Sequence, residues 1–576
     1  MRARLPVLLA VVALLGAACQ SATPSGTPTT SSAPQSSAPA SAPASQAPAS
    51  EAPESEAPES AAPSGDGGET VLRFARISDF LPSIHPADLG TGNQELMADI
   101  VFSTLVDVDS DEVTILPDLA TEWTASDDAT TFTFNLHPDA VWSDGEAVDV
   151  DDVIFTIAWS AQNPTAFKQI PVTMWTNVLG GDAVVGTTDI PEGLNRIDDH
   201  TIEITLKAPD STFLRQIAGA VYYILPEHLL ADLTAEEALT CGFCLGTVGE
   251  TIGSGPFDFS ESISAGGATF TAKQDYWKGK DSEIDTLVYK IQESNVSVAQ
   301  LAAGELDLVI RVPPAEGPGL ANTPGLEQLN VPGVGIFNIN FHNGNTDKAL
   351  RQAIAYAINR PETIEQVLGG LATINYTIPP GFTVYDDINR YEFDLDRAKE
   401  LLAESSWDVN QTFRLALLAE DPNFTVPAPA LQQYLQDLGL TVELTALPTA
   451  PYSALIQETD DFEAFLSFGG SEGVGWFQSG IYYDCDGLGT SQLKLSDERG
   501  ECIYTEQFEA AAAVTGDAQD AILHDLALDL NENLPEIYLW QPNYLHVHSD
   551  RLGGDFTIYP NERESFQKIL DWTYAP

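Results

Sequence analysis

Residues 116–157 constrain the fold of this chain more than any other segment. Residues 130–136 alternate apolar and polar side chains, which predicts a strand with one buried face. At residues 142–145 the sequence Trp-Ser-Asp-Gly predicts a tight turn, because aspartate and glycine tolerate the backbone angles of turns. The acids among residues 149–152 precede an apolar run, as at a helix N-terminus, where the helix dipole favours negative charge. A strand, a turn and a helix are therefore expected in that order.

This succession resembles family 5 of the solute-binding proteins of ABC transporters, the oligopeptide-, dipeptide- and nickel-type extracellular solute-binding lipoproteins. The family's pattern P-x-LA-x-x-W … F-x-L … W/F-x-D/N-G-x-x … DV-x-F is matched in order within residues 116–157. Further segments resemble its patterns G-x-GP-Y/F, N/D-x-x-YW-x-G, L-x-x-GE-x-D, VRQA-x-x-x-AI-x-R and D-x-x-x-A-x-x-LL: residues 253–257, 275–279, 305–308, 347–360 and 394–402. The apolar spacing predicts a helix at 347–360, the alternation of strands and helices predicts a strand at 441–447, and the resemblance implies a late strand at 533–540. The resemblance runs from about residue 70 to the C-terminus.

The resemblance implies an α/β protein with the two-lobed type II periplasmic-binding-protein fold and an extra domain inserted in the first lobe. A chain of this length also exceeds the size at which one hydrophobic core keeps growing. The expected segments are a signal peptide at 1–18, a tether at 19–68, a first lobe at 69–325 with its insertion at about 97–205, a second α/β lobe at 326–534, and a return to the first lobe at 535–576. Ligands would bind between the lobes, which close by a hinge motion.

The N-terminus predicts export. Residues 1–18 contain two arginines, a short apolar stretch and small residues, as signal peptides do. Cys19 after these small residues resembles a bacterial lipobox, which implies that Cys19 is lipidated. Gly16 stands where the lipobox usually has leucine, so ordinary signal-peptidase cleavage after Ala18 is the alternative.

Residues 19–68 consist almost entirely of serine, alanine, proline, threonine, glycine and glutamate. Such a segment cannot bury enough apolar surface to offset the entropy lost on ordering, so a disordered tether is predicted. Behind a lipidated Cys19, it would hold the folded part at the outer face of the cell membrane. An extracytoplasmic location with membrane contact through the lipid anchor is therefore expected.

Charge excludes one class of partner. The chain carries 85 acidic and 25 basic residues, a formal net charge of −60. Nucleic acid is excluded as a natural partner, because binding phosphates requires the opposite sign. The acids are spread along the chain, and we interpret this as adaptation to a salt-rich environment rather than as recognition of a cationic ligand.

This interpretation predicts that the folded protein loses stability at low ionic strength, because the repulsion among carboxylates is then less screened. Thermal melting in dilute buffer and in molar salt measures the effect. An unchanged melting temperature between the two conditions would contradict salt adaptation.

Four cysteines follow Cys19, an even number in an exported chain, which predicts two disulfides with three possible connectivities. They are Cys241, Cys244, Cys485 and Cys502, and pairing of neighbours in the sequence is preferred. A redox role is disfavoured because no thioredoxin-like context surrounds the C-G-F-C segment. A four-cysteine zinc site would need two such CxxC units, and the chain has one.

Catalytic motifs are missing from the sequence. It contains no G-x-x-x-x-G-K-[ST] phosphate loop, no H-E-x-x-H and no G-x-S-x-G, so we expect no enzyme, no cofactor and no metal. His546 and His548 would share one strand face and form a possible metal half-site, although two incidental histidines are the preferred interpretation. A secreted hydrolase using this pair is the alternative from another class, and a surface adhesin or sensor is a third.

The candidate ligand-binding residues come from the resemblance. Residues 471–479 resemble the family's G-W-x-x-D segment, which places Gly475 and Trp476 at the cleft. In peptide binders the acid of this segment holds the ligand's α-amino group, and here that position is Ser479. Glu472 is a candidate substitute from the same loop. Four further candidates are Asn93, Ser254, Tyr538 and Trp540.

The sequence therefore predicts a monomeric extracytoplasmic receptor that delivers a small molecule or peptide to an ABC permease in the membrane. Peptides are the leading ligand class because they are the most frequent ligands of the family. An oligosaccharide or another organic solute is the alternative, because the amine-binding acid is replaced and tryptophans are available for stacking.

Overall fold

The computed structural model describes residues 69–76, 84, 86, 92–109, 114–163, 175, 177–218, 222–240, 251–264, 267–313, 316–333, 335–376, 385–419, 421–470, 476, 483, 493, 504–559 and 562–575. These residues belong to one compact unit, Gly65–Pro576. Several sequence predictions lie outside the described residues: the signal peptide, the tether, Cys19, Cys241, Cys244, Glu472, Gly475, Ser479, Cys485 and Cys502.

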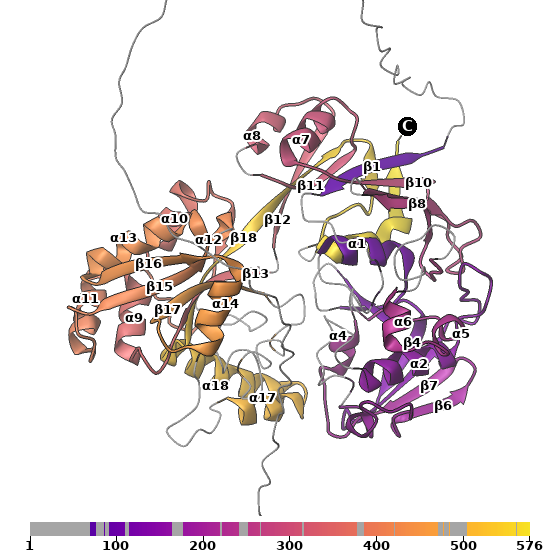
Figure 1. Cartoon of the computed structure of the whole chain (residues 1–576), viewed down its shortest axis with the longest axis horizontal. Helices are drawn as coiled ribbons and strands as arrows, with labels where there is room; N and C mark the ends of the chain where they lie inside the picture. Colours follow the sequence, from indigo (N-terminus) through magenta and orange to yellow (C-terminus); the bar gives the residue numbers. More distant parts are fainter. Residues whose placement is uncertain are drawn as a thin grey trace, which may run out of the picture. The chain divides into compact units, whose positions relative to one another are not determined.

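The described residues form a mixed sheet of twelve strands (Figure 1). Its order is β16 (Thr441–Leu447), β15 (Thr412–Leu418), β17 (Ala464–Gly470), β13 (Gly335–Phe341), β18 (Glu536–Ser549), β11 (Leu308–Val312), β1 (Val71–Arg76), β10 (Thr286–Ile291), β9 (Gly267–Ala272) and β8 (Phe257–Ser264). Two further strands, β12 (Leu326–Pro332) and β14 (Ala372–Ile374), pair with β18.

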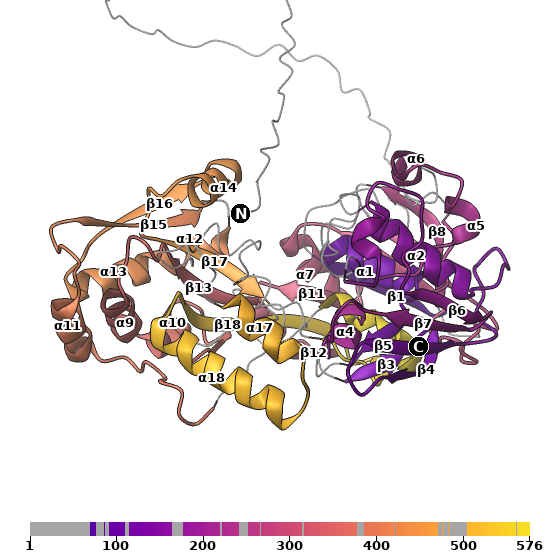
Figure 2. The same ribbon diagram turned by 90° about the horizontal axis from the view of Figure 1, so that it is seen from below.

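The long strand β18 is shared by two groups of elements. Near its start Glu536 lies opposite Asn340 of β13, and near its end His548 lies opposite Leu308 of β11. Figure 2 shows β18 between β13 and β11. We call β1 to β12 with their helices, together with the chain after β18, the first lobe, and β13 to β17 with the helices that lie between β13 and β18 in the sequence the second lobe.

The first lobe also contains smaller sheets. They are β4 (Ala120–Ala125), β5 (Thr131–Leu136), β7 (Thr201–Thr205) and β6 (Leu194–Asp198) in that order, the pair β2 (Val106–Val108) and β3 (Ile115–Pro117), and the pair β19 (Leu552–Gly554) and β20 (Trp572–Tyr574) from the end of the chain. The helices of this lobe are α1 (Gly92–Val101), α2 (Val150–Gln162), η2 (Gly181–Ala183), α4 (Phe213–Ile217), α5 (Glu227–Leu230), α6 (Ala235–Thr240), α7 (Ser294–Ala302), α8 (Gly317–Leu320) and η4 (Glu562–Asp571).

The strand, turn and helix predicted from the opening segment are confirmed. Along β5, buried and half-buried residues alternate. The backbone N–H of Gly145 donates to the carbonyl oxygen of Trp142 at 3.0 Å, and Gly145 has a φ of +94°, which glycine adopts readily. Helix α2 begins after Asp149, whose side chain accepts a hydrogen bond from the backbone of Asp151 while Asp152 bonds back to the backbone of Asp149.

Replacement of Asp149 by alanine is expected to lower the free energy of unfolding by about 1 kcal/mol, because the first turn of α2 loses its N-cap acceptor. Asp149→Asn is the matched control and is expected to keep most of the stability, since asparagine caps helices equally well. Urea denaturation measures both variants. Equal losses in the two variants would show that the carboxylate acts in some other way.

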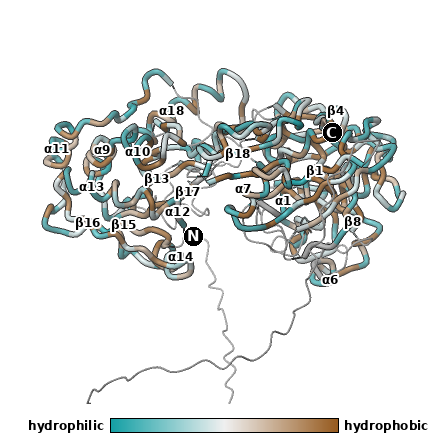
Figure 3. Tube along the Cα trace, turned by 90° about the horizontal axis from the view of Figure 1, so that it is seen from above, coloured by the Kyte–Doolittle hydropathy of each residue, from teal (hydrophilic) through white to brown (hydrophobic). Residues whose placement is uncertain are grey.

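The second lobe has a hydrophobic core on each face of its sheet. Neighbouring residues of β17 separate the cores: Leu466 packs in one and Phe465 in the other, because successive strand residues point to opposite faces. The helices are α9 (Lys348–Ala357), α10 (Arg360–Gln366), α11 (Leu395–Glu404), α12 (Pro422–Thr425), α13 (Ala428–Leu438), α14 (Thr449–Glu458), α17 (Thr505–Ala512) and α18 (Asp517–Asn533). Hydrophobic residues are concentrated along β13 and β17 (Figure 3). Every residue of β13 is buried.

Two predicted elements differ from the structure. The helix expected at 347–360 ends at Ala357, because Ile358 is extended and Asn359 caps a new helix, α10. The strand expected at 533–540 starts only at Glu536, because α18 continues to Asn533 and ends with Leu534 in a left-handed conformation. Among the described residues, helices with the length and apolarity needed to cross a bilayer are not found.

Candidate functional site

A buried polar cluster lies where β13, β17 and β18 meet in the second lobe. We call Glu536, Tyr483, Tyr538, Asn338 and Ser467 the Glu536 cluster. The hydroxyl groups of Tyr483 and Tyr538 donate to Glu536 Oε1 at 2.6 and 2.9 Å, and Asn338 Nδ2 donates to Glu536 Oε2 at 2.7 Å. Ser467 Oγ donates to Asn338 Oδ1 at 2.6 Å. Strand pairing brings these side chains together, because Asn338 is opposite both Tyr538 and Ser467.

Burial dominates the electrostatics of this cluster. It raises the pKa of Glu536 above its ordinary value, although hydrogen bonds from Tyr483, Tyr538 and Asn338 act in the opposite direction. The pKa of Tyr483 is raised well above its ordinary value, first by burial and then by the neighbouring Glu536. The cluster therefore holds one carboxyl group and two neutral phenols away from water.

Trp476 is connected to this cluster through aromatic packing. Its ring stacks on Phe508 of α17 with centroids 6.4 Å apart and planes at 17°. The same Phe508 stacks on Tyr483 at 6.0 Å and 13°. Trp476 as a whole is half-buried.

The structure places Tyr538 and Trp540 in different surroundings. Trp540 is only 2% exposed and lies parallel to Phe337, with ring centroids 4.8 Å apart. Tyr538 is buried in the Glu536 cluster instead. The pairing of β13 with β18 accounts for the separation. The neighbours Phe337 and Asn338 lie opposite Trp540 and Tyr538, so β18 carries an extra residue there, whereas residues two apart on a regular strand would share a face. Such an irregularity leaves no signal in the alternation of the sequence.

Ser254 is a buried residue of the first lobe that connects other segments by hydrogen bonds. Its side chain is fully buried, and its Oγ accepts a hydrogen bond from the backbone of Ser103 at 3.1 Å. Its carbonyl oxygen accepts hydrogen bonds from Tyr276 and Trp277. Asn93 is in the first turn of α1, and its side chain is outside the described part of the chain.

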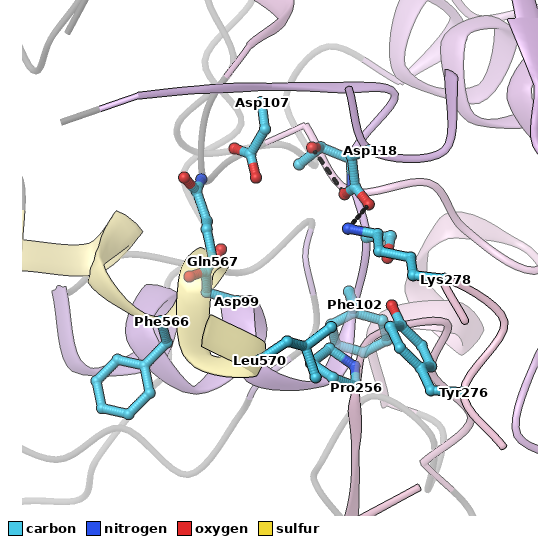
Figure 4. A pocket seen from close by; sticks show the side chains of 12 residues that line it. Asp99, Phe102, Asp107, Asp118, Pro256, Tyr276, Lys278, Phe566, Gln567 and Leu570 are labelled. Carbon is cyan, nitrogen blue, oxygen red and sulfur yellow. Dashed lines mark hydrogen bonds and ion pairs between the residues drawn. The ribbon is translucent and has the colours of Figure 1, made fainter. Parts of the chain in front are cut away.

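A polar cavity of about 20 Å³ lies in the first lobe (Figure 4). Lys278 Nζ is 2.6 Å from Asp118 Oδ1 there, and Gln567 lies at the wall beside Asp107. Burial, followed by the charge of Asp118, raises the pKa of Asp107 to about 8. A cavity of this size has room for about one water molecule. It is too small for a peptide or a sugar.

The two histidines of the possible half-site are both buried on β18. His546 Nδ1 accepts a hydrogen bond from the backbone of Arg311 at 3.3 Å, and its Nε2 is 3.8 Å from Glu562. His548 Nδ1 is 2.9 Å from the carbonyl oxygen of Ser549. Within the described ranges, no group of three or more histidine, cysteine, aspartate or glutamate side chains has a geometry that could hold a metal ion.

The chain is similar to known bacterial solute-binding proteins. Residues 114–486 match the model described as bacterial extracellular solute-binding proteins, family 5 Middle. Di/tripeptide-binding protein 1 of Pseudomonas aeruginosa is 24% identical over 514 residues, which cover 84% of this chain and 91% of the relative. Heme-binding protein A of Haemophilus influenzae is 26% identical over 397 residues, covering 65% of this chain and 69% of the relative.

A solved structure shows the same fold. The oligopeptide-binding protein AppA from Bacillus subtilis, in complex with a nonapeptide, has a TM-score of 0.69 and 20% sequence identity. The similarity covers 88% of this chain and all of AppA. The predicted α/β, two-lobed type II periplasmic-binding-protein fold with an insertion in the first lobe is therefore confirmed.

Proposed function

The chain belongs to family 5 of the bacterial extracellular solute-binding proteins, and from this membership we propose that it is the peptide receptor of an ABC importer. The match of residues 114–486 to the family model is the observation that carries the proposal. The family consists of binding proteins, which agrees with the prediction that the chain is not an enzyme. A ligand held by both lobes would favour the closed form, and the closed form would dock on the permease.

Peptides are the favoured ligands because two of the similar proteins are described as binding a di- or tripeptide and a nonapeptide. Another organic solute is the second candidate. Ser479 in place of the amine-binding acid favours it, and one of the similar proteins is named a heme-binding protein.

Trp476 is proposed as the central ligand contact, together with Gly475, Glu472 and Ser479 of the same segment. The half-buried ring of Trp476 supports this role. Asn93 at the start of α1 is proposed as a contact from the first lobe.

Three further candidates fit an indirect role better. Ser254, Tyr538 and Trp540 are buried and already engaged in hydrogen bonds or stacking, so we propose that they support the cleft from behind.

The maturation of the chain is proposed from its sequence. Residues 1–18 would be removed, Cys19 would carry the lipid, and residues 19–68 would tether a monomeric receptor to the outer face of the membrane. Two disulfides among Cys241, Cys244, Cys485 and Cys502 would form after export. The lobe boundaries near residues 325 and 535 are also part of this proposal.

Native mass spectrometry of the purified protein tests the ligand class, because it identifies small molecules that co-purify. We expect bound peptides, and a bound sugar or another organic solute in their place would favour the second candidate. Turnover of an added substrate, together with a stoichiometric metal, would instead support the hydrolase alternative.

Trp476→Ala is expected to weaken binding of the co-purified ligand about tenfold or more, as loss of a central aromatic contact does. Isothermal titration measures the affinity. Trp407→Phe is the matched control, because Trp407 is a half-buried tryptophan of the same lobe that packs against Phe413. Equal affinities in the two variants would contradict a direct role of Trp476.

A further inference from the structure

Glu536 is a buried carboxyl group to which the proposed function assigns no role. It is 6% exposed and stands at the first position of β18. Among the residues that the structure describes, neutral groups donate its hydrogen bonds, namely two phenols and one amide. Burying a carboxylate is costly unless its hydrogen bonds are well formed. An apolar residue would serve packing alone at a lower cost, so this acid requires a specific explanation.

Hydrogen bonds donated from two sides end at the carboxyl group of Glu536. Asn340 Nδ2 donates to Ser467 Oγ at 2.6 Å, Ser467 donates to Asn338 Oδ1 at 2.6 Å, and Asn338 donates to Glu536. On the other side the two phenols donate to Glu536 Oε1. This directional arrangement needs an acceptor at its end, and only a carboxylate offers acceptors on both oxygens.

One of the two phenols belongs to the chain segment between β17 and α17. Within residues 471–503 the structure describes Trp476, Tyr483 and Leu493. Tyr483 is 1% exposed, and its hydroxyl group makes the short bond of 2.6 Å to Glu536. Its ring packs edge-on against Tyr504 at 5.6 Å in addition to its stack on Phe508.

Each described residue of this segment is attached to the second lobe by a different contact. Trp476 stacks on Phe508, Tyr483 bonds to Glu536, and the carbonyl oxygen of Leu493 accepts two hydrogen bonds from Asn343. Tyr483 is the middle contact, and it shares Phe508 with Trp476. A shift of Tyr483 would therefore move the surface on which Trp476 rests.

We propose that Glu536 is a positioning residue for the ligand site, because it holds Tyr483 and, through Tyr483 and Phe508, sets the place of Trp476. This inference rests on the proposed function in one respect, the contact of Trp476 with the ligand. Tyr538 assists by donating the second phenolic hydrogen bond to the same oxygen. The buried acid thus sets where Tyr483 is attached to the sheet.

The first test compares Tyr483→Phe and Glu536→Gln with a matched control, Tyr391→Phe. Tyr391 is also 1% exposed and in the second lobe, and its hydroxyl group donates to the carbonyl oxygen of Asn531 at 2.9 Å. Tyr483→Phe and Tyr391→Phe each remove the hydrogen bond that one buried phenol donates, so these two variants should lose similar global stability. Glu536→Gln disturbs the acceptor of three hydrogen bonds. Only Tyr483→Phe and Glu536→Gln should loosen residues 471–503.

Hydrogen–deuterium exchange of peptides spanning 471–503 measures that loosening. We expect exchange to be at least about threefold faster in Tyr483→Phe and Glu536→Gln than in the wild type, with no change in Tyr391→Phe. Exchange that is equal in all three variants would overturn the inference. This measurement needs no ligand, so it is independent of the proposed function.

Titration with trialanine as a probe peptide provides the second readout. Tyr483→Phe and Glu536→Gln should bind it about tenfold more weakly than the wild type and Tyr391→Phe. Unchanged affinity alongside faster exchange would overturn the positioning role. Failure of the wild type to bind trialanine and every other peptide probe would contradict the proposed peptide receptor, while the exchange result would still decide whether Glu536 attaches the segment.

Discussion

Replacement of Glu562 by glutamine is expected to lower the free energy of unfolding by about 3–5 kcal/mol, the range found when one partner of a buried ion pair is removed. Glu562 is buried in η4 and lies between two guanidinium groups. Arg76 Nε donates to its Oε2 at 3.1 Å, and Arg311 Nε donates to its Oε1 at 2.7 Å. Glutamine has nearly the same shape but no charge, so the buried Arg76 and the partly exposed Arg311 would both lose this counter-ion.

The pKa of Glu562 agrees with this arrangement. Burial acts to raise the pKa, and the charges of Arg76 and Arg311 outweigh burial, so the pKa lies below its ordinary value. The carboxylate is therefore ionised at neutral pH, where the pair contributes to stability. It also joins β1, β11 and the end of the chain, since Arg76 ends β1 and Arg311 belongs to β11.

Glu400→Gln is the matched control for this variant. Glu400 also pairs with an arginine, Arg397, at 3.0 Å, but its side chain is 66% exposed. Exposed pairs contribute little, so the unfolding midpoint should not change. Urea denaturation of both variants at one salt concentration measures the difference. A loss below about 1 kcal/mol in Glu562→Gln would contradict the role assigned to the buried pair.

Acidification is expected to destabilise the protein through His546. Burial lowers the pKa of His546 from 6.5 to about 4; Glu562 opposes this shift, and Arg311 and Arg76 add to it. Between these two pH values the unfolded chain binds a proton that the folded chain does not bind. Stability contributed by neutral His546 is thus present above pH 6.5 and is lost as the pH falls toward 4. The loss reaches about 2.5 kcal/mol near pH 4.5, since a tenfold change in proton affinity corresponds to about 1.4 kcal/mol.

His546→Asn separates this effect from the titration of the many carboxylates. The asparagine side-chain oxygen can accept the hydrogen bond that Arg311 donates to His546, and it does not titrate. Denaturation near pH 7 and near pH 4.5 should show that the variant loses about 2.5 kcal/mol less than the wild type over this interval. Equal losses in both proteins would show that His546 is protonated in the folded state as well.

Local signals in the sequence predicted most of the regular elements. The cap of α2 depends on Asp149 and Asp152, which are three residues apart, and the strand β5 depends on the alternation of its own six residues. The predicted strand 441–447 coincides with β16. Where predictions failed, a single backbone conformation decided the boundary, as at Ile358 after α9 and Leu534 after α18. Neither isoleucine nor leucine is a residue type from which the extended conformation of Ile358 or the left-handed conformation of Leu534 could have been predicted.

The candidate site was predictable only in part. Trp476 was found through the resemblance of its segment, and its contact with Phe508 of α17 could not be inferred from that segment. Tyr538 and Trp540 are both candidates from the sequence, and the extra residue of β18 between them places them among different neighbours. Glu536 is not among the candidates from the sequence. The chain has 85 acidic residues, and the burial of this one becomes evident only when its neighbouring strands are known.

The family, the two-lobed fold and the lack of known catalytic motifs can be inferred from the sequence, because the motifs concerned consist of residues a few positions apart. Which polar and charged groups are buried together follows only from the tertiary structure. Arg76 and Glu562 are 486 residues apart, and Tyr483 and Glu536 are 53 apart. Their energies arise from removal of water around a close contact, and no local pattern encodes which distant segments a fold brings into that contact.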